Sequence, residues 1–394
     1  MTGVLNLRLA KAKGLCGTLV AALGFAIQQS IAVRAGRVIQ IEAAGPSIML
    51  SRSVTRSRSY RMVACGEQRQ TGGIMGRIQY SVVAGAAFAL STLLFAQTGF
   101  PPPPPRVSPA AGAIDIHVHS DPDVFNRSLD DIEIARLAAR KGMRGIVLKN
   151  HVAPTADRAA LVSRIVPGIE IWGGIALNRA VGGVNPSAVE WFHRMSGGRG
   201  KVVWLPTFDA DHQHKQLKEP GEGLKVAVGG KVLPETEEVL KIIARENLSL
   251  ATGHVSPDES LAVIKRAKEL GVKNIVVTHA MAEVPGMTLE QVKQAVAMGA
   301  FIEYCFLNDI HGPQSYWPFL RTWRRVSFAD IAKVIKEVGA EHFILSSDLG
   351  QNGTPTHPDG MEMMINGMKR EGISQGDVDL MVKKNPAKFL GLEG

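Results

Sequence analysis

Strand patterns and helix patterns alternate from residue 113 to the end of this 394-residue chain. Eight strand–helix units over about 280 residues match the usual span of a (β/α)8 barrel, the TIM-barrel fold. Strand runs such as IVVT (275–278) and FILSS (343–347) are apolar on both faces, which is typical of buried parallel strands. A doubly wound open sheet is the alternative, but no glycine-rich dinucleotide fingerprint follows the first strand.

Short apolar runs between Gly, Pro and polar residues define the strands, and apolar spacing of three and four residues defines the helices. We expect strands at 113–119, 145–149, 170–177, 201–208, 248–252, 273–278, 300–306 and 342–346. We expect helices near 131–141, 155–165, 186–196, 257–270, 289–298 and 328–335, a further helix that begins at Pro234 with Val239, Leu240 and Ile243 on one face, and C-terminal helices after the eighth strand. A hairpin at 224–234, turning at Gly229-Gly230, is expected to cover the end of the fourth strand as a flap.

The first strand carries two histidines on one face. In AIDIHVHSDPD (113–123), apolar residues alternate with polar ones, so His117 and His119 project to the same side, one pleat apart. Two imidazoles so placed can hold one metal ion, although a hydrogen-bonded pair without metal fits the same spacing. The pair sits at the C-terminal end of its strand, where an α/β barrel keeps its chemistry.

Polar side chains also stand at or just after the ends of the other strands. They are Lys149 and His151, Asp209, His254, His279, Glu303 and Asp348. A barrel gathers its strand ends around one axis, so these residues become neighbours. Imidazoles and a carboxylate suit Zn²⁺, with Mn²⁺ or Fe²⁺ as alternatives. The sequence therefore predicts a metal site at the C-terminal ends of the strands.

This ordered set resembles the amidohydrolase superfamily of metal-dependent hydrolases, in an uncharacterised branch. The C-terminal NPAKFLGL (385–392) is similar to an ending common in that superfamily. The resemblance implies that His117, His119 and Asp348 bind the more buried ion. It implies a second ion at His254 and His279 if two are bound, with Asp348 and His279 as the catalytic residues.

One feature departs from the superfamily pattern. Binuclear members usually carry a carboxylated lysine or a glutamate on strand four, whereas VVWLPTFD (202–209) has no lysine. Lys149 on strand two is the candidate substitute, as a carbamylated bridge between ions. Asp209 is the competing bridge, and an unmodified Lys149 that contacts an anionic group is the simpler interpretation.

Further residues are candidates for substrate contact. They are His151, Asn178, Arg179, Tyr316 and Trp317, the last two from an aromatic insertion at 307–326. The resemblance implies a hydrolase that activates water for attack on an amide, cyclic amide, ester or lactone carbonyl of a small molecule. A mononuclear metal-dependent decarboxylase of the same fold, a metal-dependent nuclease and a non-enzymatic binding protein are the alternatives.

Charge is concentrated before the barrel. The chain has a net charge of +9, but residues 1–74 hold ten of its 45 Lys/Arg and two of its 36 Asp/Glu, so the rest is nearly neutral. A nucleic-acid partner is therefore not expected.

Cys16 and Cys65 precede the barrel, which has only Cys305 and no internal disulfide. A homo-oligomer is compatible with the sequence.

The N-terminal region is interpreted as three segments before the barrel at 113–394. Residues 1–74 are basic and are expected to be disordered or an upstream segment translated in error, with Met75 as the true start. Residues 75–96 resemble a secretory signal peptide, and 97–112 a proline-rich linker. Cleavage predicts a periplasmic or secreted protein without stable membrane insertion, and lack of cleavage predicts a membrane anchor. N-terminal sequencing of the native protein tests this, because a start before residue 75 would contradict it.

Overall fold

The computed structural model describes residues 107–392 and the backbone of two short antiparallel strands, β1 (Glu42–Ala44) and β2 (Ser47–Met49). The signal-like segment 75–96, the rest of 1–74 and the linker up to residue 106 lie outside the described residues. The chain divides into the units Met1–Gly99 and Phe100–Gly394, and the second holds the barrel. Within the described part, no helix has the length and apolar character needed to cross a membrane.

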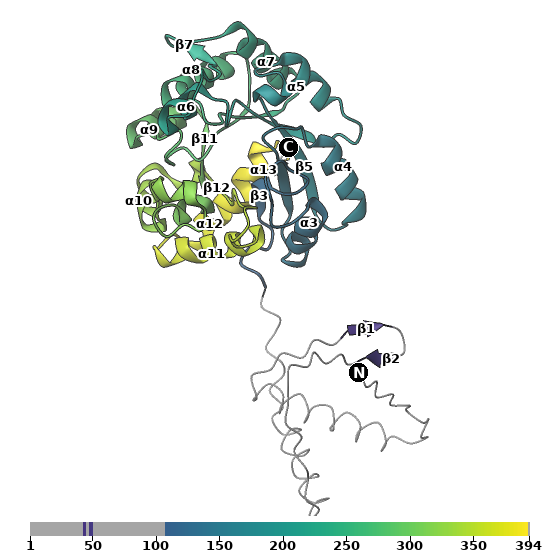
Figure 1. The fold of residues 1–394 in the computed structure, drawn as a ribbon. Helices are drawn as coiled ribbons and strands as arrows, with labels where there is room; N and C mark the ends of the chain where they lie inside the picture. Colours follow the sequence, from purple (N-terminus) through teal and green to yellow (C-terminus); the bar gives the residue numbers. More distant parts are fainter. Residues whose placement is uncertain (1–41, 45–46, 50–106, 393–394) are drawn as a thin grey trace, which may run out of the picture. The chain divides into compact units, whose positions relative to one another are not determined.

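Eight parallel strands form the barrel and follow one another in chain order, which confirms the predicted fold (Figure 1). They are β3 (Ile114–His119), β4 (Gly145–Lys149), β5 (Glu170–Ala176), β6 (Gly200–Trp204), β9 (Ser249–Ala251), β10 (Asn274–Val277), β11 (Phe301–Cys305) and β12 (Phe343–Ser346). The barrel closes just beyond β12, where the His119 amide donates to the Leu349 carbonyl at 3.1 Å and the Asp348 amide to the His117 carbonyl at 2.9 Å. β6 is shorter than predicted, because Pro206 has no N–H to donate.

Helices surround the strands in Figure 1. They are α3 (Asp131–Arg140), α4 (Ala156–Ile165), α5 (Pro186–His193), α6 (Asp211–Leu217), α7 (Pro234–Arg245), α8 (Pro257–Glu269), α9 (Leu289–Ala297), α10 (Phe328–Val338), α11 (His357–Arg370), α12 (Gln375–Asp379) and α13 (Asn385–Phe389). Ser256 and Glu259 form a capping box at the start of α8, as the sequence indicates. α6 had not been predicted, since its residues DHQHKQL carry little apolar periodicity.

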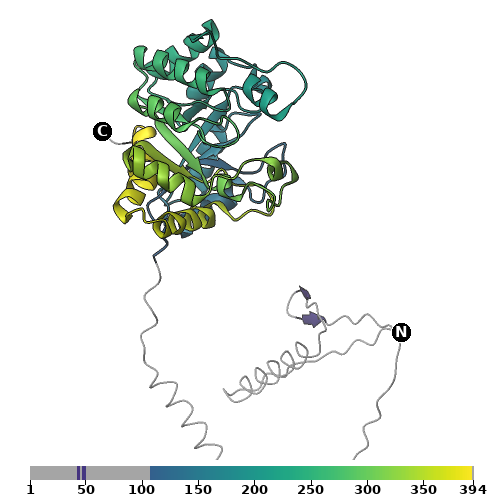
Figure 2. The same ribbon diagram turned by 90° about the vertical axis from the view of Figure 1, so that its left-hand side faces the viewer.

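Apolar side chains form two cores. The larger core lies between the strands and the outer helices, and includes Leu148 of β4 with Ile134 of α3. The smaller fills the barrel, where Trp204 packs with residues of the C-terminal segment such as Phe389. The Ser249 hydroxyl donates to the Phe389 carbonyl at 2.6 Å, so α13 plugs one end of the barrel. In Figure 2 the C terminus lies on the left, and the green loop of the 307–326 insertion on the right.

An irregularity in β3 directs its side chains. The register of β3 against β4 shifts between Asp115 and Val118. Below the shift, Ile116 packs in the inner core, and above it Val118 packs in the outer core. With strict alternation, Ile116 and the two histidines would lie on different faces of the strand, so an inward Ile116 would turn the histidines away from the barrel interior. The bulge instead lets the apolar residues fill the barrel while His117 points into its mouth.

Two insertions interrupt the alternation of strands and helices, the hairpin at 224–234 and the segment 307–326. The hairpin exists, as β7 (Ala227–Val228) and β8 (Lys231–Val232). At its entry, Leu224 pairs with Ala210 just after the fourth strand, and the Val226 amide donates to the Glu259 carboxylate at the start of α8 at 3.0 Å. A covering role over the end of the fourth strand stays a prediction. The 307–326 insertion forms two 3₁₀ helices, Phe306–Ile310 and Pro318–Thr322.

Gly350 permits the barrel to close, and its replacement by alanine is expected to be costly. Its φ is +123°, and an added Cβ would lie 2.0 Å from the His119 carbonyl oxygen. Gly350→Ala should lower the free energy of unfolding by on the order of 3 kcal/mol, measured by chemical denaturation. Gly376 is the control, since its added Cβ would meet only the Ser374 hydroxyl at 3.7 Å. Equal denaturation midpoints for the two variants would contradict this account.

Candidate metal centre

Three predicted ligands converge at the closure of the barrel. The Nε2 atoms of His117 and His119 lie 3.0 Å and 3.2 Å from the same oxygen of Asp348. All three residues are buried. Zn–N bonds of about 2.0–2.1 Å place tetrahedral ligand atoms roughly 3.3 Å apart, so this spacing fits one shared ion.

The position of the ring proton of His117 supports a shared ion at this site. Its Nδ1 lies 3.1 Å from the Glu303 carboxylate, which can only accept, so Nδ1 carries a proton. In the neutral ring the Nε2 lone pair then faces the Asp348 oxygen, an unfavourable contact that a cation between them relieves. Burial alone would lower the pKa of His117, but the Asp348 and Glu303 carboxylates outweigh it and raise the pKa to about 9. A positive charge is thus favoured at this point.

A second histidine pair lies beside the first, since the rings of His117 and His279 stack with their centroids 6.0 Å apart. The Nε2 atoms of His254 and His279 lie 3.1 Å apart, and His254 Nδ1 lies 2.5 Å from the Gln213 side-chain oxygen. Gln213 thereby fixes the His254 proton on Nδ1 and leaves its Nε2 lone pair facing His279. Burial lowers the pKa of His254 well below its usual value and that of His279 to about 4, so both rings are neutral, as metal ligands must be.

The backbone is strained at two of these ligands. His279 has φ +26° and Asp348 has φ +54°, and among the described non-glycine residues only Lys218 and Asn247 share a positive φ. Side chains rarely adopt this conformation, and it is concentrated at functional sites. The closure hydrogen bond from the Asp348 amide and a bond from the His279 amide to Glu303 hold the two residues in place.

Lys149 lies inside the cluster, as predicted. Its Nζ is 2.8 Å from His117 Nε2 and 5.3 Å from the centre of the Trp204 ring. Burial lowers its pKa, although Asp348 and Glu303 act in the opposite direction. Asp209, the competing bridge, accepts from the Arg179 amide at 2.8 Å. Among the described residues, the groups of side chains close enough to share one ion are His117 with His119 and Asp348, and His117 with Glu303 and Cys305. The choice between Lys149 and Asp209 as the bridge stays a prediction.

His151 is packed against the cluster. Its ring stacks between His119, at 4.7 Å, and Phe208, at 3.8 Å, and its Nδ1 lies 2.8 Å from the Thr207 hydroxyl. Arg127, which sequence reasoning missed, lies 3.4 Å from His119 Nδ1 and pairs with Asp123 at 2.8 Å. Its side chain is only 5% exposed, so it brings a fixed positive charge to the site.

The other predicted substrate contacts are less central. Asn178 is buried and its amide is fully used: it donates to the His151 carbonyl and the Thr207 hydroxyl, and it accepts from the Thr207 and Asp209 amides. It orders the loops and leaves no polar atom for a substrate, which corrects that prediction. Arg179 is exposed and bonds to the Glu222 carbonyl.

Tyr316 and Trp317 lie on the aromatic insertion. Tyr316 is 65% exposed, and Trp317 is fixed by a 2.8 Å bond from its indole N–H to the Asn352 carbonyl. His311 of this insertion is buried, and neither ring nitrogen has a hydrogen-bond partner among the described residues. The insertion thus offers an apolar surface and one unused imidazole.

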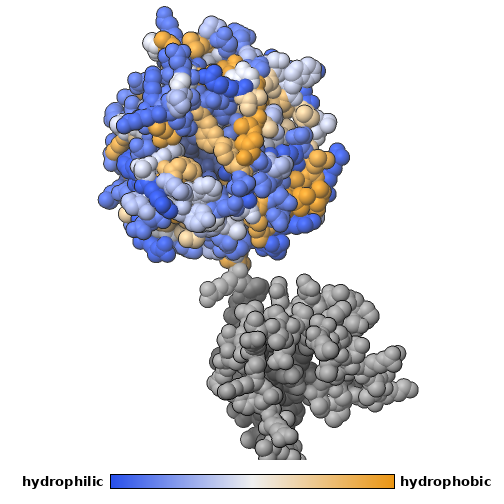
Figure 3. All heavy atoms as spheres, in the orientation of Figure 1, coloured by the Kyte–Doolittle hydropathy of each residue, from blue (hydrophilic) through white to orange (hydrophobic). Residues whose placement is uncertain are grey.

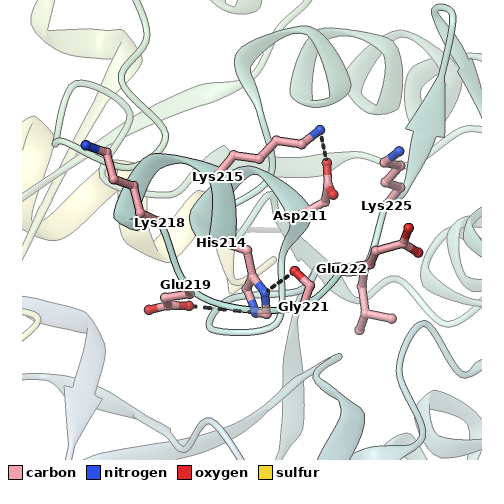
Figure 4. A pocket seen from close by; sticks show the side chains of 10 residues that line it. Asp211, His214, Lys215, Lys218, Glu219, Gly221, Glu222 and Lys225 are labelled. Atoms are coloured by element: carbon pink, nitrogen blue, oxygen red, sulfur yellow. Dashed lines mark hydrogen bonds and ion pairs between the residues drawn. The ribbon is translucent and has the colours of Figure 1, made fainter.

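The face of the barrel shown in Figure 3 is mostly hydrophilic, with separate apolar patches. A surface cavity of about 640 Å³ lies beside α6, and in Figure 4 Lys215 points toward Asp211 and His214 toward Glu219, whereas Lys218, Glu222 and Lys225 point away from these pairs. Lys215 pairs with Asp211 at 2.7 Å, and His214 lies between Glu219 and the Gly221 carbonyl. These pairs are solvated, so the cavity is a charged surface groove outside the cluster.

Comparisons with known proteins give one family match. Residues 112–303 match a family of unknown function, DUF6282. No curated protein matches the chain.

Similar solved structures include an organophosphorus hydrolase from Deinococcus radiodurans, 16% identical, covering 72% of this chain and 94% of that one, with a TM-score of 0.48. A mutant PTE-like lactonase from the same organism is 17% identical, with coverage of 73% and 98% and a TM-score of 0.48. A structure described as organophosphate hydrolysis activity engineered from a weak promiscuous lactonase template is 17% identical, with coverage of 73% and 98% and a TM-score of 0.47. Because these identities are low, the site is interpreted from its own geometry.

Proposed function

We propose that this chain is a metal-dependent hydrolase of the amidohydrolase kind, acting on an amide, cyclic amide, ester or lactone carbonyl of a small molecule. The convergence of His117 and His119 on one Asp348 oxygen carries the proposal. His117, His119 and Asp348 would hold one ion, and His254 and His279 a second, with zinc as the best fit to imidazole and carboxylate ligands. Such an ion supplies Lewis-acid activation of water and of the substrate carbonyl.

The chain's own residues supply the rest of the reaction. Burial alone would raise the pKa of Asp348, but His117 and His119 hold it well below its usual range, so the residue is a carboxylate at neutral pH. It can therefore accept the proton of the attacking water. Its side chain is 11% exposed, whereas those of the two histidines are almost fully covered, so Asp348 is the group that meets the substrate side. His279 is the second catalytic residue that the family resemblance implies, beside Asp348.

We propose that Lys149 is carbamylated and bridges two ions. Only a neutral amine attacks CO₂, and burial lowers the pKa of this lysine toward that form. The lysine first gives up one proton to become the neutral amine. Its nitrogen then forms a bond to the CO₂ carbon while one C=O electron pair moves onto oxygen, and the nitrogen releases a second proton to solvent. The product is a carbamate anion among the proposed metal ligands.

Metal analysis tests this bridge. Lys149→Ala should lower the zinc content of the purified chain from two ions to about one, and intact mass should show the wild type heavier by one CO₂. Lys215→Ala, which removes an exposed lysine of the surface groove, is the control and should leave both measurements unchanged. One ion in both wild type and variant would contradict the bridge and favour the mononuclear decarboxylase.

The test of the whole proposal is hydrolysis. The metal-loaded chain is assayed on a panel of lactones, esters and cyclic amides, with release of acid as the signal. Activity on one class that disappears in His117→Ala supports the proposal, and metal binding without hydrolysis of any class would argue against it. We also propose that the barrel is exported, since the signal-like segment 75–96 precedes it.

A further inference from the structure

Glu303 of β11 is a fully buried carboxylate that none of the proposed chemical steps uses. One oxygen lies 3.1 Å from His117 Nδ1 and accepts from the Ser346 hydroxyl at 2.6 Å. The other accepts from the backbone amide of His279 at 3.0 Å. A single side chain therefore contacts one member of each histidine pair.

We infer that Glu303 is a positioning residue that sets the ligand orientation of both histidine pairs at once. It fixes the His117 proton on Nδ1, which turns Nε2 toward Asp348 and a metal. Through the backbone amide it also holds His279 at its positive φ of +26°, a conformation that needs support from outside the residue. The inference rests on the proposed metal centre and goes beyond it, because it names what orders the ligands.

The chemistry of the contacts distinguishes glutamate from its nearest analogues. A carboxylate offers two acceptors, and both are used here by N–H donors. Glutamine offers one acceptor and one amide donor, so in either orientation its NH₂ group faces a donor, at His117 or at His279. Aspartate keeps the charge but is shorter, so it reaches one donor and not both. The Ser346 hydroxyl donates to the carboxylate and also contacts the Cys305 sulfur at 3.3 Å, and it touches neither histidine, so its loss leaves both histidine contacts in place.

Metal affinity tests this inference without any substrate. Zn²⁺ dissociation constants are measured on the full chain by competition with a chromophoric chelator, and the visible absorption of bound Co²⁺ reports ligand geometry. Glu303→Gln should weaken Zn²⁺ binding by about 10–100-fold and change the Co²⁺ spectrum, Glu303→Asp should fall between it and wild type, and Ser346→Ala should stay close to wild type.

Glu362→Gln is the matched control, because Glu362 also accepts from a hydroxyl, that of Ser108 at 2.6 Å, and from Lys141 at 2.8 Å. It should leave metal affinity unchanged. If Glu303→Gln does not fold, Glu303→Asp carries the comparison. Wild-type affinity and an unchanged Co²⁺ spectrum in the Glu303 variants would overturn the inference while the metal centre stands. If the wild-type chain binds no metal, or if His117→Ala binds metal as tightly as the wild type, both the metal centre and the role of Glu303 are overturned.

Discussion

Asp348→Asn is expected to lower kcat by about 10²–10⁴-fold, the usual contribution of a positioned acid–base group. The amide cannot accept a proton from water, and it presents a weaker ligand to an ion shared with His117 and His119. The measurement is steady-state kinetics on the substrate class found in the hydrolysis screen, with zinc content determined on the same sample. Rates are compared per bound ion, so that lost metal and lost proton transfer are separated.

Asp209→Asn is the control for this substitution. Asp209 also follows a barrel strand, but its carboxylate is paired with Arg179 and lies outside the potential metal-binding groups. Its kcat should stay near that of wild type. If Asp348→Asn retains wild-type kcat with full zinc content, Asp348 is a ligand or a structural residue and another group accepts the proton.

Metal removal is expected to destabilise the barrel strongly. Without an ion, the buried carboxylates of Glu303 and Asp348 around His117 lack a shared metal cation, and the His254 Nε2 lone pair has only His279 beside it. An ion at 1,000 times its dissociation constant adds about 4 kcal/mol of stability. For a domain of this size that is on the order of 10 °C in Tm, so Zn²⁺ added to chelator-treated protein should raise Tm by that amount.

Two controls define this thermal shift. Mg²⁺ prefers oxygen ligands, so it should not reproduce the effect of Zn²⁺ at a site dominated by imidazoles. His117→Ala should lose most of the shift, because the variant removes a ligand from the proposed first ion. A shift of the same size in His117→Ala would place the stabilising ion elsewhere in the chain.

Much of the candidate site could be predicted from the sequence, because its ligands stand where strand patterns end. His254, for example, comes just after the strand pattern LSLAT (248–252), and Asp348 follows FILSS (343–347). The orienting residues could not be predicted in the same way. Gln213 lies on α6, which has little apolar periodicity, and reaches His254 across 41 positions of sequence. Arg127 and Asp123 form an ordinary-looking pair four residues apart, and only folding brings them beside His119.

The sequence by itself determined the barrel, the order of its strands and the histidines and carboxylate at their ends, since these depend on local periodicity and on which residues terminate a strand. Tertiary structure decided which of these groups face one another: it brought Asp209 to Arg179, engaged the Asn178 side chain in loop hydrogen bonds and joined Glu303 to both histidine pairs. The physical reason is that hydrogen-bond partners across a barrel are chosen by its closure and by the bulge in β3, and neither leaves a periodic trace in the chain.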